Sequence, residues 1–106
     1  MSEMTSRSTT ATTETGYKLP SEATLKHASK LAIVEDKPIM LDYWTSSLEK
    51  NALVGVRESG EKLLVKSEDE YTSPIAKIFK VDEEFLIVTE NTIYIVSATI
   101  PTKRIS

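Results

Sequence analysis

The sequence of 106 residues has few of the residue types from which small catalytic and metal sites are built. It contains no cysteine and one histidine, His27, so a zinc cage and a Cys-His pair are excluded. A Ser-His-Asp triad would depend on His27 alone, and no serine stands in the motif that exposes a nucleophile. Three scattered glycines do not form a phosphate-binding loop. We therefore expect no enzyme, no metal site and no cofactor.

Long apolar runs are also missing. The longest uninterrupted apolar stretch is only a few residues, whereas a membrane-spanning helix needs roughly 18 to 20. The N-terminus has polar Ser and Thr where a secretion signal would have its apolar region. These absences, together with the lack of cysteine, predict a soluble intracellular protein without a membrane span.

The charge of the chain argues against nucleic acid as a partner. The 13 basic side chains are dispersed and are outnumbered by 16 acidic ones, giving a net charge of −3. Non-specific nucleic-acid binding depends on Lys and Arg that neutralise phosphates, so this partner is not expected. The acidic runs 68–70 and 82–84 lack the spacing and the glycine of a calcium loop, and we interpret them as solvated links between strands.

Residues 1–19 are predicted to form a disordered arm, and residues 20–106 a single small β-rich domain. Nine of the first 15 residues are Ser or Thr, and so few apolar residues cannot offset the entropy lost on ordering. The alternative is an arm that orders on a partner. In that case Tyr17 and Leu19, the only large apolar residues near its end, should make the contact.

One helix is predicted, over residues 20–34. Pro20 and Ser21 resemble a helix start, and the following apolar residues recur three and four positions apart, which gives one apolar stripe. The stripe consists of Leu25, Ala28, Leu31 and Ala32. A helix this short needs a sheet to pack against.

The rest of the sequence is typical of antiparallel strands, because blocks rich in Ile, Val, Phe and Tyr alternate with polar breaks. The expected strands are residues 38–44, 52–58, 61–67, 75–81, 84–89 and 92–98. The predicted fold class is mainly β (α+β), a small curled antiparallel sheet or barrel of five to six strands with one N-terminal helix. The stretch FLIVTENTIYIVS resembles the paired strands of pleckstrin-homology-like and other small β-barrel modules, although the helix that follows the last strand of the pleckstrin-homology-like fold has no counterpart here.

The first of two predicted hairpins has Ser59-Gly60 as a two-residue loop. This loop would pair Val56 with Leu63 and Val54 with Val65. The four apolar residues would then share one face of the hairpin, and basic side chains would occupy the other.

The second hairpin has a two-residue turn at Glu90-Asn91. The expected pairs are Phe85 with Val96, Leu86 with Ile95, Ile87 with Tyr94, and Val88 with Ile93. Both faces of this hairpin are apolar, so both must be covered. The cover can come from a sheet that curls onto itself, from the 20–34 helix, or from another molecule, and we prefer the first two.

Trp44 is the first candidate for a partly exposed binding anchor, because it ends a predicted strand beside polar residues and Trp is enriched at binding hot spots. The alternative is that the aromatic residues, Trp44 included, form the core. The predicted function is a non-catalytic protein-interaction or assembly module, such as a minor subunit of a larger complex or particle. Its partner would be another protein or a second copy, through Trp44, Tyr43, Tyr17 and Leu19. The alternative is a small β-barrel domain that binds nucleic acid or acidic lipid.

Overall fold

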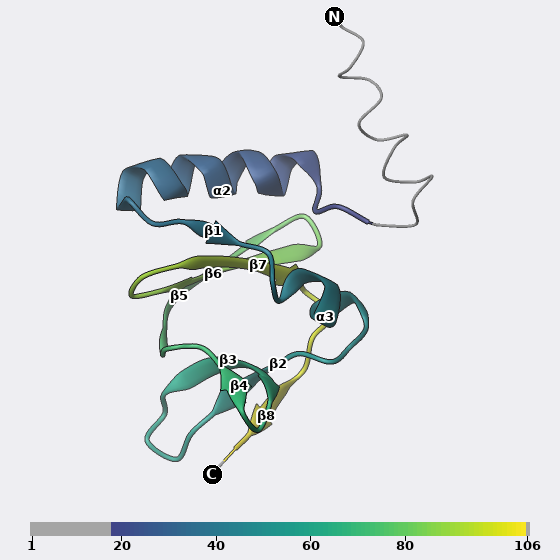
Figure 1. The fold of residues 1–106 in the computed structure, drawn as a ribbon, viewed down its shortest axis with the longest axis vertical. Helices are drawn as coiled ribbons and strands as arrows, with labels where there is room; N and C mark the ends of the chain where they lie inside the picture. The colour runs from purple at the N-terminus through teal and green to yellow at the C-terminus, as the bar shows by residue number, and fades with distance from the viewer. Residues whose placement is uncertain (1–17, 106) are drawn as a thin grey trace, which may run out of the picture.

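The structure is a computed structural model that describes residues 18–105. Two four-stranded sheets and a long helix are stacked in three layers, with helix α2 (Glu22–Glu35) on the outer face of the first sheet (Figure 1). That sheet, called sheet A, has the order β1 (Ile39–Met40), β7 (Ile93–Ser97), β6 (Glu84–Thr89), β5 (Ile75–Val81). Sheet B has the order β4 (Glu70–Tyr71), β3 (Lys62–Ser67), β2 (Leu53–Val56), β8 (Thr102–Arg104). A short helix, α3 (Trp44–Leu48), lies beside β7.

The protein is mainly β, as predicted, but the expected single curled antiparallel sheet or barrel is wrong. Both sheets are open, and both are mixed, because β1 pairs in parallel with β7 and β8 in parallel with β2. Residues 18–105 contain eight strands, more than the five to six expected. Three of the eight have only two or three residues, too few to show a pattern in sequence. The strand predicted at 38–44 is shortened to Ile39–Met40, and α3 begins at Trp44.

Helix α2 lies where the apolar stripe predicted it. Ser21 caps its start, since the Thr24 backbone N–H donates to Ser21 Oγ at 3.1 Å. It ends at Glu35, and the cap residue Asp36, with a left-handed backbone (φ 56°), donates its N–H to the Ala32 carbonyl. The buried Ala28 faces sheet A and packs in one cluster with residues of β6 and β7. The helix therefore covers one face of the sheet, as expected.

The hairpin β6–β7 has the predicted register, with Leu86 opposite Ile95 and Ile87 opposite Tyr94. The Thr89 N–H donates to the Thr92 carbonyl across the two-residue turn. Because alternate residues point to opposite faces, Leu86 and Ile95 pack under the helices while Ile87 packs against sheet B. The hairpin is therefore the middle layer, shared by two cores.

The register predicted for the hairpin β2–β3 is wrong by one residue. Gly60 has φ 95° and its N–H donates to the Arg57 carbonyl at 2.9 Å, so the loop contains three residues, 58–60, in place of two. Val54 therefore lies opposite Leu64, and Gly55 opposite Leu63.

The shift reverses the expected faces of this hairpin. Val54 and the fully buried Leu64 belong to the core between the two sheets. Leu63 lies on the outer face, opposite Gly55, over which Ile105 packs. Sheet B is therefore apolar on both faces, whereas the predicted register gave it one polar face.

Candidate interaction surface at the edge of sheet A

The structure buries the two aromatic residues predicted as binding anchors. Trp44 and Tyr43 are each only 5% exposed, so the expectation of a partly exposed Trp44 is wrong. Trp44 packs with Leu86 and Ile95, and its indole N–H donates to the Lys18 carbonyl at 2.7 Å. Both side chains turn inward because this segment enters helix α3 and does not continue as a strand.

Tyr43 lies in the other core, between the sheets. Its ring packs edge-to-face against Tyr94, with 5.3 Å between ring centroids, and the Lys66 ammonium lies 4.7 Å from the Tyr43 centroid. Burial raises the pKa of Tyr43 to about 12, and burial likewise raises the pKa of Tyr94. Of the two remaining candidates, Leu19 is 49% exposed, and Tyr17 lies outside the described residues.

Among the four edge strands of the two sheets, β5 offers the longest row of unpaired backbone groups. It is the longest strand among residues 18–105, with seven residues, and in that part of the chain only β6 pairs with it. Its backbone N–H and C=O groups on the open side can therefore pair with another strand. Two large apolar side chains on β5, Ile78 and Phe79, are 40% and 41% exposed. The edge is thus both unpaired and partly apolar.

The side chains of β5 alternate between the two faces of sheet A. Phe79 lies opposite Leu86 and therefore faces α2, as does Lys77, two residues away. Ile78 lies opposite Ile87 and faces the sheet B side, together with Lys80. Each face of the edge strand consequently carries one apolar and one basic side chain near its middle.

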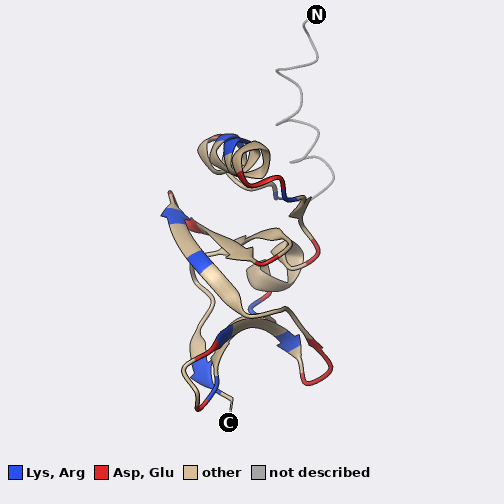
Figure 2. Cartoon of the chain, turned by 90° about the vertical axis from the view of Figure 1, so that its left-hand side faces the viewer, with Lys and Arg blue, Asp and Glu red and all other residues tan. Residues whose placement is uncertain are grey.

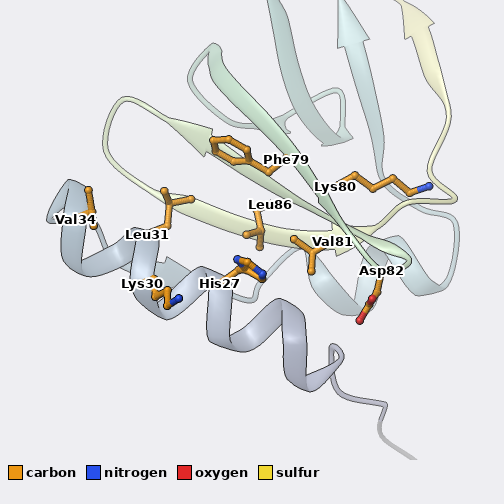
Figure 3. Close-up of a pocket in the computed structure, with 9 residues that line it drawn as sticks. All are labelled: His27, Lys30, Leu31, Val34, Phe79, Lys80, Val81, Asp82 and Leu86. Atoms are coloured by element: carbon orange, nitrogen blue, oxygen red, sulfur yellow. The ribbon is translucent and has the colours of Figure 1, made fainter.

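A hollow of about 590 Å³ separates β5 from helix α2 (Figure 3). Its walls are apolar, with Leu31 and Val34 on the helix, Phe79 and Val81 on β5, and Leu86 on β6. Val34 is 79% exposed at the end of the helix, so the hollow opens to solvent there. An apolar side chain inserted between the helix and the strand would be covered on both sides.

Charged side chains of both signs lie around this hollow. His27 and Lys30 line it from α2 and Asp82 from the turn after β5, whereas the Lys80 side chain points away from the hollow towards the other face of the sheet (Figure 3). Neither Lys30 nor Lys80 forms an ion pair within residues 18–105. Figure 2 shows the Lys and Arg positions of the chain, which lie on α2 and on strands of both sheets.

An ion pair fixes the helix to the edge strand at the C-terminal end of α2. The Lys77 ammonium donates to Glu35 Oε2 at 2.8 Å, and Lys37 lies 3.2 Å from Glu35 Oε1. Hydrogen bonds from Lys77 and then from Lys37 hold the pKa of Glu35 below its usual value. Lys77 remains 53% exposed and can still meet a second carboxylate.

Hydrogen bonds fix the other end of the helix to the turn between β5 and β6. The buried Glu84 carboxylate accepts from Thr24 Oγ1 at 2.5 Å and from the Ser21 N–H at 3.3 Å. Ser21 Oγ donates to Asp82 Oδ2 at 2.9 Å. The positive end of the helix dipole favours both carboxylates. With both ends held, α2 is a fixed wall of the hollow.

Residues 18–105 contain no grouping of three potential metal-ligating side chains. In the same range no helix has the length and apolar character to cross a membrane. His27 is exposed on α2 and lies beside the hollow. The arrangement at this edge is suited to pairing with backbone and to holding apolar and acidic side chains.

Comparison with known proteins gives no relative, because no family model matches the chain and the searches found no similar curated protein and no similar solved structure. The candidate surface therefore depends on the geometry alone.

Sequence reasoning identified β5 as a strand but did not single out its edge. The signal was present, since Lys77 and Lys80 place one charge on each face of the strand, which is typical of an edge strand.

Proposed function

We propose that this protein is a non-catalytic protein-interaction module that binds an extended segment of a partner protein along β5. The observation that carries the proposal is the seven-residue open edge beside an apolar hollow. Addition of a strand to a sheet edge is a common form of peptide recognition, in which backbone hydrogen bonds give affinity and side-chain pockets give specificity.

The other sheet edges support such binding less well. Strands β1 and β4 have two residues each and β8 has three, so each can form very few ladder hydrogen bonds. At about 3.3 Å per residue, β5 extends over about 23 Å. This is sufficient to bind six or seven residues of a partner strand.

Two single substitutions of matched exposure test this function. Phe79→Lys places a charge in the open edge, which is how natural edge strands prevent pairing. The control is Leu41→Lys, which makes the same change outside the edge strand. The two side chains have similar exposure, 41% for Phe79 and 45% for Leu41. Proteins captured from the native source by the wild type and by Leu41→Lys should be lost with Phe79→Lys.

A purified partner should then slow hydrogen exchange of the β5 amides, since a paired N–H is protected. If Phe79→Lys retains the same proteins as the wild type, or if the β5 amides exchange equally fast with and without a bound partner, the edge is not the binding surface.

A further inference from the structure

The side chains of β5 define what a partner strand must present. Lys77 and Lys80 carry positive charge on opposite faces of the strand, and the half-exposed Ile78 and Phe79 lie between them. A strand paired with β5 places one residue opposite each of these four. The most favourable partner thus has an acidic residue opposite each lysine and apolar residues opposite Ile78 and Phe79.

We infer that the partner of this edge is an acidic extended segment with the pattern acidic–apolar–apolar–acidic, and this inference rests on the proposed function. The pattern reads the same in both directions, so it fits a parallel or an antiparallel strand. The apolar residue opposite Phe79 faces α2, where the hollow beside Leu31 and Val34 is open to receive it. The apolar residue opposite Ile78 lies on the other face.

The charges on β5 disfavour a second copy of this chain as the occupant. Two β5 strands paired with each other would bring four lysines into one ribbon without an acidic residue of either strand to compensate them. Moreover, the acidic–apolar–apolar–acidic pattern occurs nowhere in the 106 residues. The lysines therefore act against self-association and in favour of an acidic partner, which is how specific interfaces combine repulsion and attraction.

Glu35 competes with an acidic partner residue for the ammonium group of Lys77. Its carboxylate already accepts from Lys77 at 2.8 Å, so a partner carboxylate must share this lysine. Lys80 has no such competitor among residues 18–105. Removing the charge of Glu35 should consequently strengthen binding of an acidic strand.

Three synthetic peptides test the inference with the full-length protein. They are capped octapeptides, Thr-Val-X-Val-Val-X-Val-Thr, with X as Glu, Gln or Lys. Because two exposed ion pairs form with the first peptide only, the Glu peptide should bind about tenfold tighter than the Gln peptide, and the Lys peptide should bind most weakly. The difference should decrease as the salt concentration rises. Calorimetry or fluorescence anisotropy measures the three affinities.

Reversing the charge of the two β5 lysines tests whether they determine the preference for an acidic peptide. Lys77→Glu with Lys80→Glu should reverse the order, so that the Lys peptide binds tightest. The matched control, Lys62→Glu with Lys103→Glu, changes the net charge equally at exposed positions on sheet B and should keep the wild-type order. Glu35→Gln should raise the affinity for the Glu peptide severalfold. Circular dichroism establishes that each variant is folded.

The other outcomes separate this inference from the proposed function. If all three peptides bind the wild type equally and Phe79→Lys abolishes binding, the edge is a strand-binding site but its acidic specificity is wrong. If no peptide binds at millimolar concentration, or if the charge-reversed variant keeps the wild-type order, the inference is overturned. If light scattering shows a dimer that Phe79→Lys converts to a monomer, the occupant is a second copy and the inference is likewise overturned.

Discussion

Removing the Trp44 side chain tests the assignment of this residue to the core. Trp44 is 5% exposed and packs with Ala28, Leu86 and Ile95, so it joins α2 and α3 to sheet A. Trp44→Ala leaves a cavity between these elements. Trp44→Phe keeps an aromatic ring there but removes the indole N–H that donates to the Lys18 carbonyl.

The expected losses are large relative to the stability of so small a domain. Replacing a buried Trp or Phe by Ala costs about 3–5 kcal/mol. A folded unit of this size has a free energy of unfolding of about 5–13 kcal/mol, at about 0.05–0.15 kcal/mol per residue. Trp44→Ala should therefore remove about a quarter or more of the stability. Trp44→Phe should cost about 1–2 kcal/mol, because only one hydrogen bond and part of the ring are lost.

Urea unfolding followed by far-ultraviolet circular dichroism measures both losses, with Leu41→Ala as an exposed control that should stay within about 0.5 kcal/mol of the wild type. Trp44 is the only tryptophan, so its fluorescence gives a second readout in the unmodified protein. Acrylamide should quench it weakly in the native state and strongly in urea. A loss below 1 kcal/mol for Trp44→Ala, or equal quenching in both states, would refute the core assignment.

Three further substitutions probe the packing and the ionisation of other groups. Gly55→Ala should destabilise the protein by about 1–3 kcal/mol, since the new Cβ would lie 2.7 Å from Ile105 Cδ1. Urea titration should show a smaller cost when the same substitution is made in the Ile105→Ala variant. Equal costs in the two backgrounds would argue against this contact. The free energy of unfolding of the wild type should fall as the pH rises above 10, and Tyr43→Phe should make this fall smaller. The raised pKa of Tyr43 means that its contribution is present below pH 10 and is lost as the pH rises towards 12, so parallel wild-type and variant curves in that range would contradict the assignment. Glu84→Gln should cost about 1–3 kcal/mol in thermal or urea unfolding, because it weakens the hydrogen bonds to Thr24 and the Ser21 N–H, whereas a neutral effect would mean that these bonds do not fix the helix.

The elements that sequence reasoning predicted correctly are those whose local signals agree. In β6–β7, a two-residue polar turn and continuous apolar blocks specify one register, and the structure has it. In α2, the stripe through Leu25, Ala28 and Leu31 coincides with a cap at Ser21. Local propensity and burial indicate the same structure in both cases.

The hairpin β2–β3 was mispredicted because its loop sequence allows two lengths. Ser59-Gly60 suits a two-residue turn, but Gly60 equally suits the left-handed position that closes a three-residue loop. The second loop brings Leu64 into the core between the sheets and places Leu63 on the outer face, opposite Gly55, over which Ile105 packs. Ile105, which covers Gly55 in this register, lies 45 residues beyond Gly60 along the chain, so no local pattern contains this contact.

Helix α3 depends on contacts that lie far away in the sequence. The segment from Trp44 to Leu48 contains Thr and Ser, which have low helix propensity. The buried Ser47 stabilises it, because its Oγ donates to the Trp44 carbonyl at 2.6 Å and accepts from the Ser97 N–H at 2.9 Å. Strand and helix were therefore not distinguishable from the sequence here, and the choice of Trp44 as a surface anchor failed for the same reason.

The candidate binding surface could be predicted only in part, because a strand becomes an edge through the order of its sheet. The pattern of β5 identified a strand, and its two lysines were visible. Its exposure follows from β1, which pairs with β7 and so extends the opposite side of sheet A. Only Ile39 and Met40 form this pair, since the chain then turns into α3. Had β1 paired with β5, the lysines would have been enclosed in a central strand, where their charges are costly. The lysines on β5 and the position of β1 are thus consistent with each other, and together they leave the longest strand of the described chain available to a partner.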